Sequence, residues 1–149
     1  KGVCHLYVDS AADEVKALNI LKNGKTQRTG VCNSLETLLV HQDVAATFLP
    51  KSAALLAEYD TVIHACENSI EYFSGAQIAT EEDWHAEYLA MEIAVKVVAD
   101  FDLAIEHIEE YSSGHTEVIV SQDYSNTQAF IRRINSAVVM ANASSRFSD

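Results

Sequence analysis

The sequence lacks the features that mark membrane, secreted and fibrous proteins. No apolar run approaches the ~20 residues that a membrane-spanning helix needs, and the chain does not open on the long apolar core of a signal peptide. It has no internal repeat, low-complexity tract or flexible linker. Its three cysteines are odd in number and widely spaced, which gives neither a disulfide framework nor a metal-binding pattern. These absences predict a cytoplasmic protein in a reducing compartment, with no membrane partner and no metal.

Positive charge is also scarce. Ten Lys and Arg face 22 Asp and Glu, for a net charge of -12. Nucleic-acid binding needs clustered cations, and the ten here are scattered, so the composition argues against a nucleic-acid partner. The chain contains neither a Gly-x-Gly-x-x-Gly turn nor a phosphate-binding Gly-Lys-Ser/Thr loop. We therefore do not expect residues 1–149 to bind a dinucleotide by themselves.

The remaining composition is that of one globular domain. With 149 residues, 48% hydrophobic and 21% charged, the chain is long enough for a substantial core. Apolar strand-like runs alternate with amphipathic segments, which predicts an α/β fold with a mainly parallel sheet covered by helices on both faces. The expected strands are 3–8, 36–41, 61–65, 93–98, 116–120 and 137–141, and the expected helices are about 11–22, 43–58, 101–111 and 123–134, with short turns over 67–73 and 80–87.

Local signals place some of these boundaries. Ser10 and Asp13 have the spacing of a helix cap, and an Asn23-Gly24 pair should end that helix. The periodicity assigns Val15 to its core face, together with Ala11, Leu18 and Leu21. Thr80 and Asp83 repeat the cap spacing. Pro50 lacks a backbone donor and should kink or split the helix over 43–58.

One polar and cationic stretch contains a thiol and directly precedes a run that should form a buried strand. Lys25 and Arg28 come first, Gly30 tightens the chain, and Cys32 precedes the apolar run of residues 35–41. The thiolate is the reactive form of cysteine, and nearby positive charge favours it. The pattern makes Cys32 a candidate nucleophile, although a lone cysteine with no histidine beside it in the sequence is more often structural.

Residues 25–50 resemble the catalytic-cysteine segment of the gamma-glutamyl phosphate reductase (glutamate-5-semialdehyde dehydrogenase) family, a proline-biosynthesis branch of the aldehyde dehydrogenase superfamily. The resemblance continues, in the family's order, through residues 2–9, 87–89, 94–98, 113–117 and 142–149. Because it covers nearly the whole chain, it is more specific than any single motif. It implies that residues 1–149 form the cysteine-bearing catalytic domain of an oxidoreductase with the aldehyde dehydrogenase fold.

The resemblance also implies a reaction. The Cys32 thiolate would displace phosphate from gamma-glutamyl phosphate, and NADPH would reduce the resulting thioester to glutamate 5-semialdehyde. In the family, NADPH is bound mainly by a separate Rossmann-like domain, which we expect to lie upstream in a longer polypeptide. The isolated chain should therefore be inactive. The face that met the missing domain would expose apolar surface, which favours self-association into a homo-oligomer.

Several residues inherit expected roles from the resemblance. Lys25 and Arg28 would contact the phosphate or carboxylate of the substrate, or else be surface cations near a helix end. Asn142, Ser144 and Arg146 follow the last strand, where loops of this fold meet substrate, and Arg146 would bind the substrate's α-carboxylate in bidentate fashion unless it belongs to a frayed terminus.

Glu87 is the residue expected to bind the cofactor. The superfamily places a glutamate for the nicotinamide-side ribose in a Glu-x-Phe-Gly-Pro pattern, but this sequence reads Glu-Tyr-Leu-Ala-Met from Glu87 onward. A solvated glutamate on a helix face is the alternative. Cys4 and Cys66 should pack as small hydrophobes, the six histidines show no ligand spacing, and Trp84 should be a hydrophobic anchor with no basic or aromatic partner.

Two other functions fit the same residues. One is another acylating aldehyde dehydrogenase, for instance one that uses a coenzyme A thioester. The other is a non-catalytic α/β binding module in which Cys32 is buried and unreactive.

Overall fold

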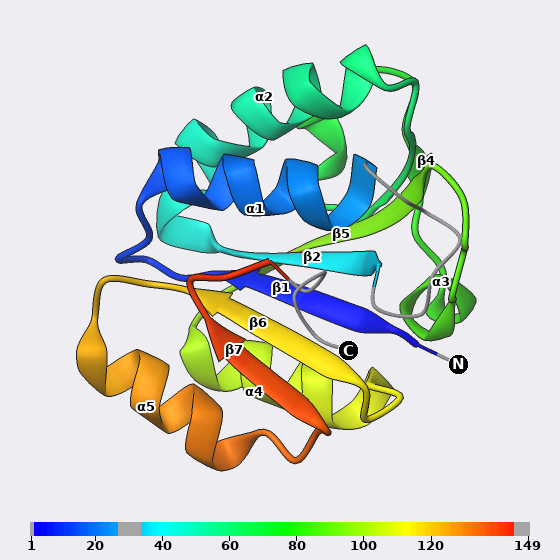
Figure 1. Cartoon of the computed structure of the whole chain (residues 1–149). Coiled ribbons are helices and arrows are strands. Elements are labelled where there is room, and N and C mark those ends of the chain that lie inside the picture. Colours follow the sequence, from blue (N-terminus) through cyan, green and yellow to red (C-terminus); the bar gives the residue numbers. More distant parts are fainter. Residues whose placement is uncertain (1, 27–33, 145–149) are drawn as a thin grey trace.

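The computed structural model describes residues 2–26 and 34–144 and contains one sheet in which all neighbouring strands are parallel (Figure 1). The strand order is β4-β3-β5-β2-β1-β6-β7. The strands are β1 (Cys4–Val8), β2 (Leu35–His41), β3 (Val62–Ala65), β4 (Gln77–Ile78), β5 (Glu92–Val98), β6 (Thr116–Val120) and β7 (Val138–Ala141). This confirms the expected fold class.

Helices cover both faces of the sheet. Figure 1 shows α1 and α2 on one face and α4 and α5 on the other, with the short α3 beside one end of the sheet. Their bounds are α1 (Glu14–Thr26), α2 (Gln42–Glu58), α3 (Glu81–His85), α4 (Phe101–Tyr111) and α5 (Tyr124–Arg133), with a 3₁₀ turn η1 over Ile70–Tyr72. Because the strands are parallel, their amino ends share one edge of the sheet and their carboxyl ends share the other.

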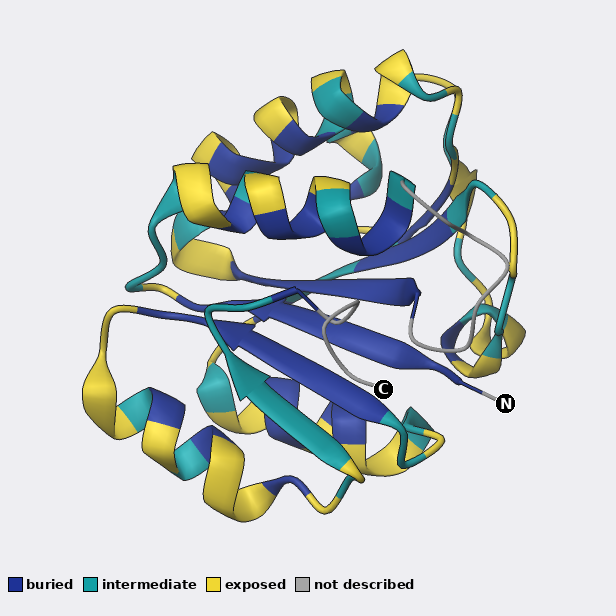
Figure 2. Cartoon of the chain, in the orientation of Figure 1, coloured by how far each residue is buried: buried dark blue, intermediate teal, exposed yellow. Residues whose placement is uncertain are grey.

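Alternate side chains of each central strand pack into two separate cores, one on each face of the sheet. In β2, Leu38 and Val40 pack in the core under α1 and α2, while Leu39 packs in the core under α4 and α5. All seven residues of β2 are buried, as expected for a strand covered on both faces. Figure 2 shows this burial along the centre of the sheet, with β7 only half-buried at one edge.

Helix α1 differs from the sequence expectation at both its core face and its end. Its buried residues are Ala17, Ile20, Leu21, Gly24 and Lys25. The side chain of Val15 is instead 70% exposed. The helix also continues through the Asn23-Gly24 pair to Thr26, so the predicted stop was wrong. The extra turn places Lys25 against a buried partner on β2, a long-range contact that no local stop signal reveals.

Pro50 was expected to kink or split the helix over 43–58; the split does not occur, and one short strand was not expected. Pro50 lies inside α2 without splitting it, and Pro50 and Ala46, four residues before it, are both exposed. Water can therefore bind the backbone carbonyl that Pro50 leaves without a partner. Strand β4 was not expected, because two exposed residues are too short to show a periodic pattern.

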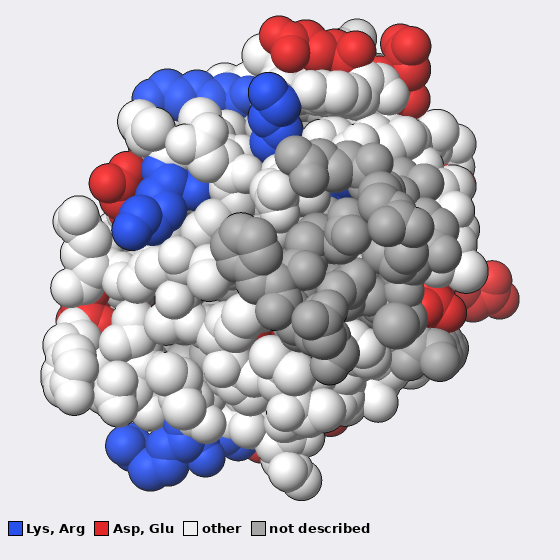
Figure 3. Space-filling view, in the orientation of Figure 1, with Lys and Arg blue, Asp and Glu red and all other residues white. Residues whose placement is uncertain are grey.

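Basic side chains on the face seen in Figure 3 gather in separate places and form no continuous stripe. No helix in the described part of the chain combines the length and apolarity that crossing a membrane requires.

His107 is a buried histidine on α4. Its side chain packs edge-on against Trp84, at 5.3 Å between ring centroids, and near His5, at 5.6 Å. Burial lowers the pKa of His107 to about 2, and the neighbouring His5 and Lys96 charges act in the same direction. His107 is therefore neutral in the folded protein over the physiological range.

This neutrality makes stability depend on pH. In the unfolded chain His107 has a pKa of about 6.5, so below that pH the unfolded state binds a proton that the folded state does not. Between pH 7 and pH 5 this residue should lower the free energy of unfolding by about 2 kcal/mol. Urea unfolding at both pH values, compared with a His107→Phe variant that retains a ring, measures the difference. An equal loss in both proteins would contradict the assignment.

Candidate functional site

The ends of the Cys32 segment are joined at the amino edge of the sheet. Cys32 and Arg28 themselves lie outside the described residues. On either side of that gap, Lys25 is in the last turn of α1 and Ser34 immediately precedes β2. The Ser34 hydroxyl donates to the Gly24 carbonyl at 3.2 Å, and Lys25 Nζ donates to Glu36 Oε1 at 2.6 Å. The two ends are thus held together by buried polar contacts.

The Lys25–Glu36 ion pair is fully buried on both sides. Burial lowers the pKa of Lys25 and raises that of Glu36, and each charge opposes the shift in its partner. Such a pair is costly to desolvate and depends on good geometry and on further hydrogen bonds. Lys25 is therefore not a surface cation, and its charge is matched by Glu36. Its predicted contact with substrate stays a prediction.

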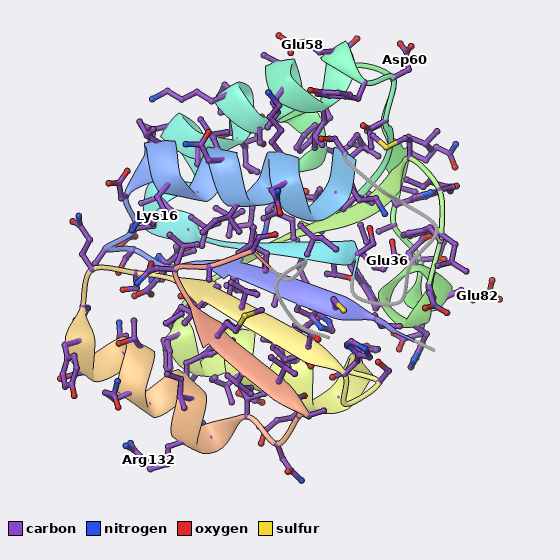
Figure 4. The ribbon with its side chains drawn as sticks, viewed as in Figure 1. Lys16, Glu36, Glu58, Asp60, Glu82 and Arg132 are labelled. Carbon is purple, nitrogen blue, oxygen red and sulfur yellow. The ribbon has the colours of Figure 1, made fainter. Side chains whose placement is uncertain are left out.

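Glu36 also reaches the segment that carries Glu87. Its second oxygen, Oε2, accepts the backbone N–H of Leu89 at 3.2 Å. Glu87, two residues earlier, accepts the Gly2 backbone N–H through Oε2 at 2.6 Å. Figure 4 shows Glu36 at the end of the sheet nearest α3. The structure thus brings the flanks of the Cys32 segment and the Glu87 segment to one place.

Glu87 itself is not on a helix. Helix α3 begins at the expected Thr80 cap, where the Thr80 backbone N–H donates to Asp83 Oδ2 at 2.8 Å, but it ends at His85. The alternative of a solvated helix-face glutamate is therefore wrong. Glu87 is half-buried in the stretch that follows α3.

Trp84 has partners that its sequence context did not reveal. It is buried, as expected of an anchor. The Lys96 ammonium lies 5.4 Å from its ring centroid, and His107 packs against it. The expectation that no basic or aromatic side chain accompanies Trp84 was therefore wrong, because β5 and α4 supply both from distant parts of the sequence.

Asn142 lies at the opposite edge of the sheet, where the strands have their carboxyl ends. It follows β7 with φ +58°, and its side-chain amide bonds the Ser121 backbone in both directions, at 3.0 and 3.1 Å. Ser121 follows the carboxyl end of β6, whereas the flanks of Cys32 lie at the amino ends. The structure therefore does not bring Asn142 to the flanks of Cys32. Ser144 is buried, and Arg146 lies outside the described residues.

Glu36 is the residue that sequence reasoning missed. The strand was predicted, but the carboxylate inside it was read only as part of the run. A single charge in an otherwise apolar, two-sided buried strand is the signal that could have found it, because such a charge needs a partner. In residues 2–26 and 34–144, no group of three or more His, Cys, Asp or Glu is arranged to hold a metal ion.

Comparison with known proteins extends the resemblance to the whole chain. The chain is 63% identical to the gamma-glutamyl phosphate reductase of Colwellia psychrerythraea and 60% identical to that of Idiomarina loihiensis. Each match covers 100% of this chain and 36% of the relative, so the chain spans little more than a third of these proteins. No protein-family model matches the chain.

Solved structures agree. The crystal structure of gamma-glutamyl phosphate reductase from Thermotoga maritima matches with a TM-score of 0.96 at 46% identity, over 99% of this chain and 36% of that one. A glyceraldehyde-3-phosphate dehydrogenase from Methanocaldococcus jannaschii, solved in complex with NADP, matches with a TM-score of 0.78 at 17% identity, over 99% of this chain and 41% of that one. The second match concerns the fold alone. From end to end, the chain resembles one part of the gamma-glutamyl phosphate reductases and has the aldehyde dehydrogenase fold.

Proposed function

We propose that residues 1–149 form the cysteine-bearing catalytic domain of an NADPH-dependent gamma-glutamyl phosphate reductase of proline biosynthesis. The observation that carries this proposal is the 63% identity to such a reductase over the whole chain. The amino-edge geometry supports it, because the segments that carry the proposed nucleophile and the proposed cofactor residue meet through Glu36. The nucleotide-binding domain would come from the part of the relatives that this chain does not span.

In this proposal Cys32 supplies the covalent step. Its thiolate attacks the carbonyl carbon of the acyl phosphate, and the bond from that carbon to the phosphate oxygen breaks. Inorganic phosphate departs, and the acyl group stays bound to the Cys32 sulfur as a thioester. The Cys32 backbone N–H is the local donor for the tetrahedral oxyanion. NADPH, when bound, supplies the hydride that reduces the thioester carbon. The thiolate is then expelled as glutamate 5-semialdehyde forms.

Other residues of the chain would bind and orient the reactants. Arg28 and Arg146 supply cations for the phosphate and the α-carboxylate. Glu87 would accept a ribose hydroxyl of the cofactor through Oε1, since Oε2 accepts the Gly2 N–H. Lys25 is already paired with Glu36. Its proposed contact with the substrate would follow from its position beside the Cys32 segment.

The reverse reaction tests the choice of substrate. Oxidation of glutamate 5-semialdehyde by NADP, measured at 340 nm with the nucleotide-binding part present, should require inorganic phosphate and should not respond to coenzyme A. Phosphate is the nucleophile that releases the acyl group in this direction. Turnover that is independent of phosphate and stimulated by coenzyme A would instead support the alternative acylating dehydrogenase.

The isolated chain should behave differently. Positioning the nicotinamide against the thioester carbon supplies ~7–11 kcal/mol of barrier reduction, and in this proposal the rest of the protein provides that positioning. Residues 1–149 alone should therefore show no measurable reductase activity and no tight NADPH binding, and both should return when the remaining part is present. Micromolar NADPH binding to the chain alone, measured by titration calorimetry, would contradict this placement of the cofactor site.

A further inference from the structure

A surface hollow of about 400 Å³ lies between β5 and α4, and none of the described residues that line it belongs to the flanks of the Cys32 segment. We call it the β5–α4 hollow. The residues on which the argument depends are Lys96 and Val98 of β5 and Leu103, Glu106 and Glu110 of α4. Its volume is within the range of small-molecule sites, and its lining combines a cation, carboxylates and apolar side chains.

Lys96 is a half-buried cation on β5. Among the described residues, no Asp or Glu lies within ion-pair distance of its ammonium group. Its contacts are the Nδ1 atom of His107, at 3.4 Å, and the face of Trp84. Both rings are neutral, since His107 does not protonate in the folded protein. A partly desolvated ammonium with one neutral acceptor retains donors for an anion.

The outer wall of the hollow has the opposite charge. Glu106 and Glu110 are exposed and lie one turn apart on α4, so their carboxylates share a face of the helix. No ion pair within the described part of the chain involves either of them. The apolar part of the lining includes Leu103, which is exposed, and Val98, which is almost fully buried. A ligand that satisfies all three features carries a carboxylate, an ammonium group and an apolar side chain.

We propose that the β5–α4 hollow binds a small apolar α-amino acid, with the ligand carboxylate on Lys96, its ammonium group on Glu106 and Glu110, and its side chain against Val98 and Leu103. This site is independent of Cys32 and of the proposed reductase reaction. A dicarboxylic amino acid would bind less well, because its second carboxylate would meet the two glutamates.

Nuclear magnetic resonance of the ¹⁵N-labelled 149-residue chain tests the ligand class. L-leucine is the probe, and saturable shifts are expected at amides of β5 and α4. L-leucinamide lacks the carboxylate and N-acetyl-L-leucine lacks the ammonium group, so each should bind at least about tenfold more weakly, the equivalent of ~1.4 kcal/mol. Absence of saturable shifts with L-leucine, or equal binding of all three compounds, would overturn the proposal.

Variants assign the two charges separately. Lys96→Gln should weaken L-leucine binding at least about tenfold without changing that of L-leucinamide, and Lys96→Arg should retain binding. Glu106→Gln combined with Glu110→Gln should weaken L-leucine and L-leucinamide but not N-acetyl-L-leucine. Glu109→Gln, on the same helix but outside the hollow, is the matched control. The same loss in this control, or unchanged leucine binding in Lys96→Gln, would show that the hollow is not the site.

Discussion

Replacing Lys25 by Met should lower the free energy of unfolding by about 3–5 kcal/mol, the cost of leaving one charge of a buried ion pair without its partner. Methionine fills much of the lysine volume, so the loss would come from Glu36, which would remain fully buried. Among the described residues, only the Leu89 N–H would then donate a hydrogen bond to its carboxylate. Urea unfolding followed by circular dichroism at pH 7 measures the change. A loss under about 1 kcal/mol would show that the pair is not buried as the structure has it.

Two further variants separate charge from packing. In the double variant Lys25→Met with Glu36→Leu, both charges are gone, and much of the lost stability should return, because apolar pairs often replace buried ion pairs without cost. The matched surface pair is Lys51 with Glu14, at 2.7 Å, in which the Lys51 side chain is 57% exposed. Lys51→Met should cost no more than about 1 kcal/mol. Equal losses for Lys25→Met and Lys51→Met would contradict the distinction.

Replacing Cys32 by Ala should reduce gamma-glutamyl phosphate reduction on the order of 10⁶-fold, the scale seen when a covalent nucleophile is removed. The substitution deletes one sulfur atom and removes the thioester step, so folding should be retained. The assay follows NADPH oxidation at 340 nm with the nucleotide-binding part present. Cys66→Ala is the control, since Cys66 lies half-buried after β3, and its activity should stay within a few-fold of the original. Turnover retained in Cys32→Ala would refute the proposed role.

Alkylation of the chain by iodoacetamide separates an activated thiol from a structural one. An activated Cys32 should react well below the ordinary thiol pKa of ~8.5, because only the thiolate is nucleophilic. Mass spectrometry would report the rate at each cysteine as pH is varied. Cys4 is buried and should react slowly. A rate at Cys32 no greater than those at Cys4 and Cys66 would favour the non-catalytic binding module.

The sequence by itself determined the alternation of strands and helices, and with it the parallel sheet. Strands such as β2 and β6 are buried on both faces and are therefore mostly apolar in sequence, although each contains a glutamate, and caps such as Thr80 with Asp83 are local. Helix α1 is an element in which a local signal predicted the wrong boundary. Its stop signal at Asn23-Gly24 was overridden because one more turn lets Lys25 pair with Glu36, eleven residues further along the chain.

Only the tertiary structure decided which residues meet. Strand order cannot be read from a run of apolar residues, so the sequence did not show that Glu36 on β2 contacts Leu89, or that Asn142 binds Ser121 at the opposite edge of the sheet. For the same reason the sequence did not show what surrounds the Lys96 ammonium group. Its neighbours His107 and Trp84 come from α4 and α3. Hydrophobic periodicity reports burial along one element, whereas pairing of charges depends on which elements the fold makes neighbours.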